Sequence, residues 1–186
     1  MTRKLVASLF TSVDGVAADP YLFQYDSFDD DLGAWMTQAI DRVDDAVLGR
    51  VSYTEWAGYW PTVTEGEDVS FADFINHVPK HVASRTLRPE DLAWKNSRLI
   101  EGDLVEAISA LKQTEGGDIA VEGSLSVVRQ LVMAGLMDEL TLVVHPAVAG
   151  TGRRLFDEAS PTRLALLDVQ RTSKGNLLAT YGPHQG

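Results

Sequence analysis

The chain contains no cysteine. This absence excludes a disulfide framework, a thiolate metal site and a cysteine nucleophile. No stretch reaches the roughly 18 consecutive apolar residues that span a bilayer, and the first ten residues lack the long apolar run of a signal peptide. We therefore expect a cytoplasmic protein without a membrane partner, whose fold rests on packing alone.

Basic residues are also scarce. Lysine and arginine total 16 against 27 aspartates and glutamates, and the formal net charge is -11. Such a charge repels a phosphate backbone, so nucleic acid is not an expected partner. An anionic small ligand must be held by local donors, either backbone N–H groups or a few arginines.

The pattern of apolar residues predicts an α/β fold. Hydrophobic residues make up 45% of the 186 residues, enough to bury a core. We predict strands at 4–10, 46–48, 80–83, 98–100, 118–121 and 139–145, helices at 29–43, 51–58, 70–77, 103–112 and 124–133, and a terminal hairpin at 163–172 and 176–181. This alternation predicts one domain over residues 1–186, with a largely parallel central sheet, flanking helices and a C-terminal antiparallel hairpin.

The junction that follows residue 118 is the most informative stretch. A predicted strand leads through Gly123 and Ser124 directly into a helix. Such a junction places backbone N–H groups and a positive helix end at the carboxyl edge of a sheet, where a pyrophosphate can bind. The alternative is a plain tight turn, since no G-x-G-x-x-G motif is present.

Short motifs in a fixed order extend over most of the chain. They are Ser12–Gly15, Leu48–Tyr53, Ala83–Leu87, Glu122–Ser124, Gln130-Leu131, Leu136–Leu140, Pro146, Gly150, Gly152 and Arg153–Phe156. Together they resemble the reductase domain of riboflavin biosynthesis and its stand-alone relatives in the dihydrofolate reductase superfamily. The resemblance implies a dihydrofolate reductase-like fold and NADPH as the cofactor.

The resemblance also implies which residues bind the cofactor. Val13, Asp14 and Gly15 would lie by the nicotinamide, Gly49, Arg50 and Ser52 by the adenosine, Ser84, Arg85 and Thr86 by the adenine ribose, and Gly123, Ser124 and Leu125 by the pyrophosphate. We expect NADPH to be preferred over NADH, with Arg50 and Arg85 as the candidate donors to its 2′-phosphate. No acidic residue flanks either arginine to bind a ribose hydroxyl, as it does in sites specific for NAD. Solvated surface arginines are the alternative.

The segment that would contact the substrate departs from the family pattern. Riboflavin enzymes carry an Asp-Pro-x-Leu-Thr-x-Arg stretch where this chain has residues 55–60, and no Lys or Arg lies between residues 54 and 79 to meet the glutamate tail of dihydrofolate. Trp56 and Trp60 are candidates for a flat wall over a planar ring, or else core residues. Asp30 and Asp31 are the candidate proton donors, with helix N-capping as the alternative.

Other chemistries fit less well. His77 and His81 have helical ligand spacing, but Pro79 interrupts the helix between them, so no metal site is expected. The preferred function is an NADPH-dependent reductase of a small planar heterocycle, resembling 5-amino-6-(5-phosphoribosylamino)uracil reductase or dihydrofolate reductase. A catalytically idle nucleotide- or metabolite-binding homodimer is the alternative. A homodimer is expected in either case, from the apolar stretch 140–146 and the terminal hairpin.

Overall fold

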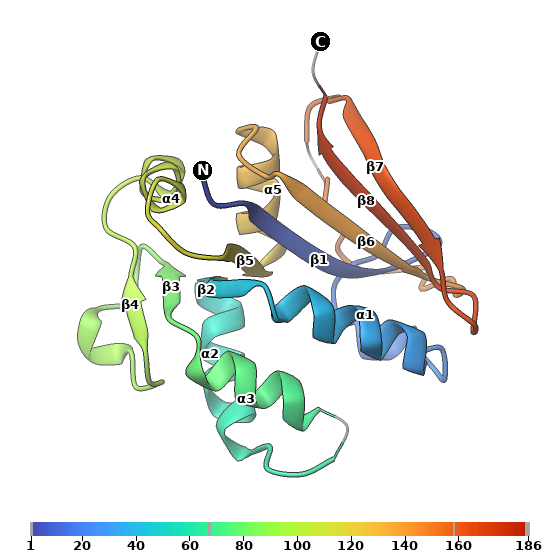
Figure 1. Cartoon of the computed structure of the whole chain (residues 1–186), viewed down its shortest axis with the longest axis horizontal. Coiled ribbons are helices and arrows are strands. Elements are labelled where there is room, and N and C mark those ends of the chain that lie inside the picture. The colour runs from blue at the N-terminus through green and yellow to red at the C-terminus, as the bar shows by residue number, and fades with distance from the viewer. Residues whose placement is uncertain (1, 67, 158, 185–186) are drawn as a thin grey trace.

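The computed structural model describes residues 2–66, 68–157 and 159–184. Eight strands form one sheet in the order β4-β3-β2-β5-β1-β6-β8-β7 (Figure 1). The strands are β1 (Leu5–Ser12), β2 (Val43–Gly49), β3 (Lys80–Ala83), β4 (Ser97–Leu99), β5 (Asp118–Gly123), β6 (Glu139–His145), β7 (Leu164–Arg171) and β8 (Leu177–Pro183).

The sheet is largely parallel. From β4 across to β6 every neighbouring pair is parallel, and only β8 runs against its neighbours β6 and β7. The carboxyl ends of the other seven strands therefore lie at one edge, which we call the carboxyl edge. Both the parallel sheet and the terminal antiparallel hairpin confirm the fold predicted from the sequence.

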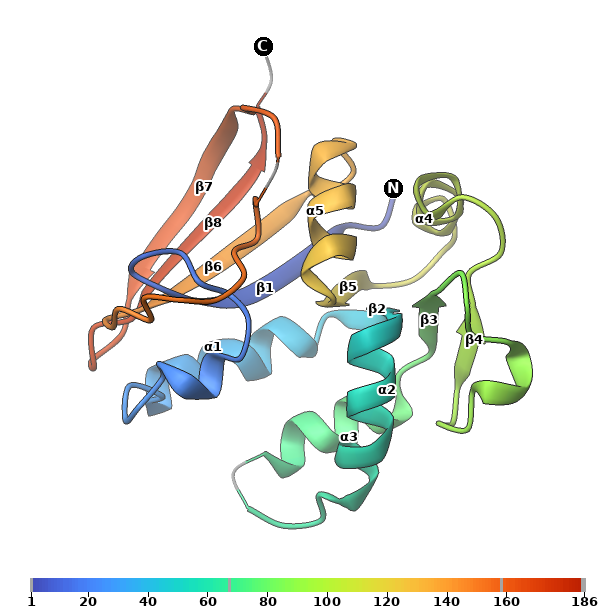
Figure 2. The same ribbon diagram turned by 180° about the vertical axis from the view of Figure 1, so that it is seen from behind.

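Helices cover both faces of the sheet. They are α1 (Asp30–Ile40), α2 (Arg50–Tyr59), α3 (Val69–His77), α4 (Leu104–Lys112) and α5 (Leu125–Met133), joined by 3-10 turns at Pro20–Leu22, Trp60–Thr62 and Pro89–Asp91. Side chains alternate along β2: Val47 packs with residues of α4 and α5, whereas Leu48 packs with α2 and α3. Figure 2 shows α5 on the side of the sheet turned away from α1. No helix in the described part of the chain is long and apolar enough to cross a membrane.

The predicted bounds differ most from the structure between α1 and β2. The helix expected at 29–43 ends at Ile40, because Val43 already pairs with Asp118 in the sheet. The strand expected at 46–48 therefore begins three residues earlier, at Val43. It contains Asp44 and Asp45, which the apolar pattern did not predict in a strand. At the other end of α1, Asp29 is the N-cap and accepts a hydrogen bond from the backbone N–H of Leu32.

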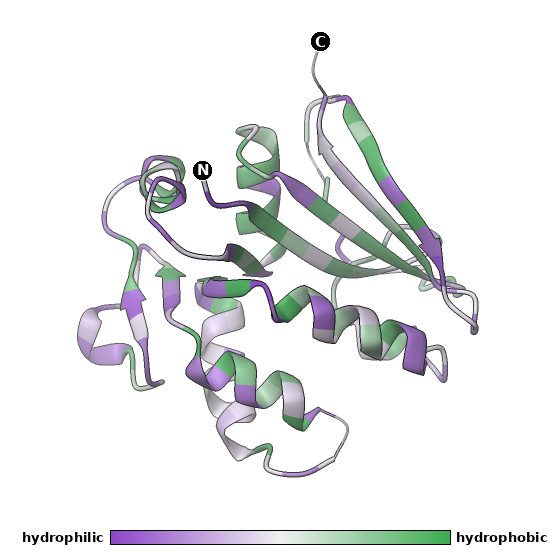
Figure 3. Cartoon of the chain, in the orientation of Figure 1, coloured by the Kyte–Doolittle hydropathy of each residue, from purple (hydrophilic) through white to green (hydrophobic). Residues whose placement is uncertain are grey.

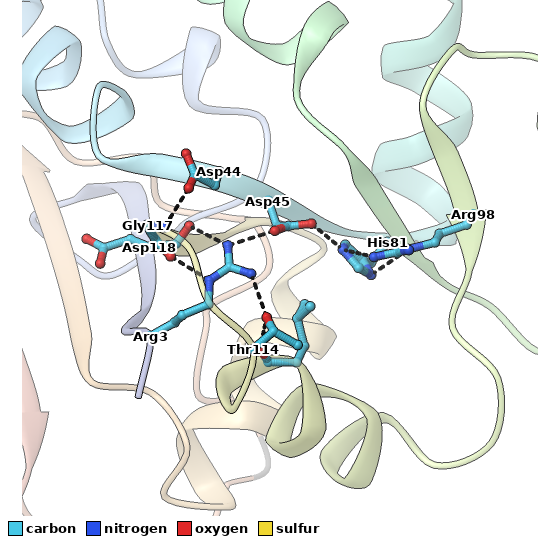
Figure 4. Close-up of polar contacts among 9 residues, drawn as sticks. Arg3, Asp44, Asp45, His81, Arg98, Thr114, Gly117 and Asp118 are labelled. Carbon is cyan, nitrogen blue, oxygen red and sulfur yellow. Dashed lines mark hydrogen bonds and ion pairs between the residues drawn. The ribbon is translucent and has the colours of Figure 1, made fainter. Parts of the chain in front are cut away.

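A buried ionic network joins several strands at the edge opposite the carboxyl edge (Figure 4). The Arg3 guanidinium donates to Asp45 at 2.7 Å, to the carbonyl of Gly117 at 2.6 Å and to the Thr114 hydroxyl at 3.1 Å. His81 Nε2 donates to the second Asp45 oxygen at 2.6 Å. Asp45 thus bridges Arg3 and His81, and this bridge holds the segment before β1, β2 and β3 together.

Lys80 is fully buried behind α3. Its ammonium donates to the carbonyls of Ile75 at 2.8 Å, Asn76 at 3.4 Å and Val78 at 2.9 Å, and it lies 4.6 Å from the centre of the Trp94 ring. Burial lowers the pKa of Lys80 to about 8. The lysine therefore satisfies the last carbonyls of a helix, at the end where the helix dipole favours a positive charge.

Replacing Lys80 with methionine should lower the free energy of unfolding by about 2–4 kcal/mol, because these buried carbonyls lose a charged donor. Urea unfolding followed by circular dichroism measures the loss. Lys95→Met is the matched control, since Lys95 is exposed and near Trp94 in sequence. Equal stability of the two variants would show that the carbonyls do not depend on Lys80.

Candidate functional site

Two helix N-termini meet at the carboxyl edge. Helix α2 begins after Gly49 at the end of β2, and α5 begins at Leu125, directly after Ser124, beyond the end of the neighbouring strand β5. A Cβ atom on Gly49 would lie 2.6 Å from Ser124 Oγ and 2.9 Å from its backbone nitrogen. Only glycine permits this approach, which places the positive ends of both helices side by side.

Neither of these helices has a side-chain cap among the described residues. Gly49 has no side chain, and the Ser124 hydroxyl lies 3.0 Å from Ser126 Oγ instead of capping the helix. By contrast, Asp103 caps α4 by accepting from two backbone N–H groups. The first N–H groups of α2 and α5 therefore remain open to an anion at the same place.

Gly123 and Ser52 complete this cradle, which we define as Gly49, Ser52, Gly123 and Ser124. Gly123 has a φ of 130°, and a Cβ atom there would lie 2.6 Å from Ser52 Oγ. The peptide between Gly123 and Ser124 is cis. Four of the residues expected to bind a cofactor are thus brought together, and Leu125 follows them as the first residue of α5.

Arg50 and Arg85 lie at the same edge. Gly49 and Ala83 are register partners in β2 and β3, so the residues that follow them leave neighbouring strand ends. Ser84 shapes the second turn by accepting from the backbone N–H groups of Thr86 at 3.1 Å and Leu87 at 2.9 Å. Both arginines are exposed, and no described residue forms an ion pair with either.

The turn at Ser12–Gly15 is held by Asp14. The Asp14 carboxylate accepts from Ser12 Oγ at 2.7 Å and from the backbone N–H groups of Ala149 at 2.9 Å and Gly150 at 2.8 Å. These bonds lower the pKa of Asp14 to about 2. Asp14 therefore remains ionised at neutral pH and ties this turn to the loop that follows β6, while Val13 is left exposed.

The two candidate substrate tryptophans lie between α2 and α3. The rings of Trp56 and Trp60 contact each other edge-on at 5.8 Å between centroids, and both contact Phe71, at 5.9 Å and 4.8 Å. They are partly buried against the cluster that contains Tyr53 and Ile75. This packing is that of a core, and a role as a wall over the substrate stays a prediction.

The two candidate proton donors lie at the start of α1. Asp30 and Asp31 are both exposed, and the Asp31 carboxylate accepts from the backbone N–H of Ser173 at 2.8 Å in the hairpin turn. The N-cap role considered as the alternative for Asp30 and Asp31 is filled by their neighbour Asp29. A catalytic role for Asp30 or Asp31 stays a prediction.

Glu122 is an acid whose role the sequence analysis missed. Glu122 lies between Val121, which packs in the cluster with α4 and α5, and Gly123, at a point where the register of β5 against β2 shifts by one residue. No hydrogen bond or ion pair from a described residue reaches its carboxylate, and burial raises its pKa to about 7. The signal in the sequence was a single acid at the end of the apolar run Ile119–Val121, directly before Gly123.

Comparison with known proteins identifies the family. The family model of the RibD C-terminal domain matches residues 3–178. The chain belongs to this family. The YyaP protein of Bacillus subtilis (strain 168) is 26% identical over 182 residues, which cover 96% of this RibD C-terminal domain protein and 94% of YyaP.

Solved structures share the fold of this RibD C-terminal domain protein. A putative riboflavin biosynthesis protein from Shewanella sp. PV-4 matches with a TM-score of 0.73 at 19% identity over 100% of both chains. A diaminohydroxyphosphoribosylaminopyrimidine deaminase/5-amino-6-(5-phosphoribosylamino)uracil reductase from Thermotoga maritima matches with a TM-score of 0.66 at 12% identity, over 98% of this chain and 57% of that one. The dihydrofolate reductase-like fold expected from the sequence is thereby confirmed.

Proposed function

We propose that this RibD C-terminal domain protein is a reductase that uses NADPH to reduce a small planar heterocycle. The observation that carries the proposal is the pair of uncapped helix N-termini, α2 and α5, which meet where Gly49 contacts Ser124. In a chain with a net charge of -11, such a cluster of backbone donors suits an anionic group.

The residues at the carboxyl edge fit a dinucleotide. The cradle would hold the pyrophosphate through the backbone N–H groups at the starts of α2 and α5, which have no side-chain cap. Arg50 and Arg85, with Ser84 and Thr86, would hold the adenosine end, and the turn at Val13–Gly15 would lie by the nicotinamide. When bound, NADPH supplies the hydride.

Glu122 is the candidate proton donor in this proposal. A carboxyl with a pKa of about 7 is half protonated at neutral pH, which matches the requirement for a general acid. Glu122 directly precedes Gly123 of the cradle, so the heterocycle would lie beside it. A neutral heterocycle is favoured, since residues 54–79 contain no lysine or arginine for a phosphate or a glutamate tail.

Binding of NADPH to the wild-type chain tests the proposal, measured by quenching of its four tryptophans. We expect saturable quenching by NADPH and weaker binding of NADH. Binding followed by oxidation of NADPH with a pyrimidine or pteridine compound supports the reductase. Binding without turnover of any such compound favours a nucleotide-binding protein, and no binding of either dinucleotide rejects the proposal.

Replacing Arg50 or Arg85 with alanine should weaken NADPH binding ten- to a hundredfold and leave NADH binding nearly unchanged. A charge-assisted bond to the 2′-phosphate contributes about 1.5–3 kcal/mol, and about 1.4 kcal/mol corresponds to tenfold. Arg163→Ala is the control, because Arg163 is exposed beside β7, at the opposite end of the strand order from β2 and β3. If the affinities for NADPH and NADH fell equally, the arginines would contact a part of the cofactor that both dinucleotides share. That result would contradict the expected selectivity.

A further inference from the structure

Arg154 joins Arg50 and Arg85 at the carboxyl edge. All three are exposed, and no described residue forms an ion pair with any of them. By contrast, Arg3 and Arg42, which precede β1 and β2, form ion pairs with carboxylates. In a chain with a net charge of -11, unpaired guanidinium groups beside a cluster of backbone donors are placed to meet an anionic ligand.

Arg154 lies against the turn that follows β1. Strand β1 is hydrophobic over most of its length (Figure 3), and the polar turn Ser12–Gly15 begins at its end. Arg154 Nε donates to the carbonyl of Asp14 at 3.0 Å, and a Cβ atom on Gly15 would lie 3.8 Å from Arg154 Cδ. The two Nη atoms of the guanidinium have no partner among the described residues. They are therefore available to a ligand at this turn.

The loop that contains Arg154 is fixed to the turn on both sides of this residue. Arg154 forms an antiparallel bridge with Val16, and its backbone N–H donates to the Asp157 carboxylate at 2.9 Å. Gly152 has a φ of 139°, and a Cβ atom there would collide with Val16. Asp14 ties the earlier part of the same loop to the turn. The position of Arg154 is thus set by the fold before any ligand binds.

The order of the strands indicates which half of a dinucleotide would lie near Arg154, and this step rests on the proposed function. The cradle lies at the ends of β2 and β5, Arg85 follows β3 on one side of it, and Arg154 lies at the end of β1 on the other side. A dinucleotide with its pyrophosphate on the cradle and its 2′-phosphate near Arg85 extends its nicotinamide half toward β1.

The register of β1 also favours the nicotinamide half over the pyrophosphate. Leu5 pairs with Ile119, so continuing this register places Leu9 level with Gly123 of the cradle. Strand β1 runs three residues further, to Ser12. At the rise of a β-strand these residues extend about 10 Å beyond the cradle. The turn and Arg154 therefore lie too far along for the pyrophosphate and suit the nicotinamide ring.

We propose that Arg154 lies beside the nicotinamide ring and makes the site favour the reduced dinucleotide over the oxidised one. The ring is neutral in NADPH and carries one positive charge in NADP+, whereas the other groups of the two dinucleotides are the same. A guanidinium beside the ring raises the free energy of bound NADP+ and leaves that of NADPH nearly unchanged. This selectivity would promote release of the oxidised cofactor after its hydride has left.

Titration calorimetry with NADPH and with NADP+ at pH 7 tests this role. Arg154→Gln is the main variant, because glutamine has an N–H where arginine has Nε and can still donate to the Asp14 carbonyl, but it has no charge. In this variant the Kd for NADP+ divided by the Kd for NADPH should fall about three- to tenfold. Asp14 is unchanged in it, so the charge of its carboxylate does not enter the comparison.

Two further variants separate the charge of Arg154 from other effects. Arg154→Lys retains the positive charge and should keep the wild-type ratio of the two Kd values. Arg153→Gln removes the same charge from the neighbouring exposed arginine, whose side chain forms no hydrogen bond with the turn, and should also keep that ratio. If Arg154 only held the turn in place, its loss would weaken both dinucleotides alike and leave the ratio unchanged.

An unchanged ratio in Arg154→Gln, with both dinucleotides bound, overturns the inference and leaves the proposed function intact. The same fall in Arg153→Gln would assign the effect to the overall charge of the protein and overturn the inference. The same fall in Arg154→Lys would show that the charge is not responsible, and would overturn it as well. A wild type that binds neither dinucleotide rejects the proposed function and the inference together.

Discussion

Replacing Asp45 with alanine should lower the free energy of unfolding by about 3–5 kcal/mol, the largest stability loss we expect from one substitution. The Arg3 side chain is only 3% exposed, and Asp45 is the sole carboxylate within ion-pair distance of it among the described residues. Without Asp45 the guanidinium keeps its bonds to Gly117 and Thr114 but is left as an uncompensated buried charge. Alanine also removes the acceptor of His81 Nε2.

Urea unfolding at pH 7 measures this loss. Asp44→Ala is the control, because the neighbouring Asp44 is exposed and accepts only from the backbone N–H of Gly117 among the described residues. We expect this control to cost about 1 kcal/mol, as for a single hydrogen bond. The double variant Arg3→Met with Asp45→Ala should recover part of the stability, since it removes the unpaired charge. Equal losses in Asp45→Ala and Asp44→Ala would contradict the role of the network.

In the proposed reductase reaction, replacing Glu122 with glutamine should slow the reduction of the heterocycle by about a hundred- to ten-thousandfold and leave the affinity for NADPH unchanged. Glutamine keeps the size of the side chain but has no proton to deliver at neutral pH. Stopped-flow oxidation of bound NADPH measures the step, and tryptophan quenching measures binding. Asp30→Asn and Asp31→Asn are the comparisons, because both residues were the proton donors expected from the sequence.

The pH profile shows whether Glu122 acts as the acid. Burial raises the pKa of Glu122 to about 7, so its protonated form is present below that pH and is lost above it. The wild-type rate should therefore fall as the pH rises through 7, and the Glu122→Gln rate should not. A folded Glu122→Gln protein with the wild-type rate would exclude this role. If, in addition, Asp31→Asn greatly slowed the reaction, Asp31 at the start of α1 would be the better candidate for the proton donor.

Local sequence pattern was enough to place most helices and strands. The strands at 80–83 and 139–145 have the bounds predicted, because apolar and β-branched residues within them are bounded by polar or turn residues. Asp103, the first residue of the helix predicted at 103–112, caps that helix by accepting from the backbone N–H groups of Val105 and Glu106. Such features depend on neighbours within one turn, and a single sequence contains all of them.

Strand β2 is the element for which local pattern failed. Asp44 and Asp45 are poor strand residues by propensity, yet both lie in β2. Both aspartates can lie in a strand because they accept hydrogen bonds from Arg3, Gly117 and His81. These partners are 36 or more residues away in the chain. Tertiary hydrogen bonds and ion pairs outweighed a local preference of a fraction of a kcal/mol.

The sequence by itself determined the order of the elements, the parallel sheet and the glycine junction before α5, because periodicity and turn residues are local properties. Only the tertiary structure decided that Gly49 contacts Ser124 and that Ser52 lies beside Gly123, since these contacts join segments more than 70 residues apart. It also decided the raised pKa of Glu122 and the exposure of β7. Desolvation and coverage depend on which elements pack against a side chain, and no pattern along the chain specifies that.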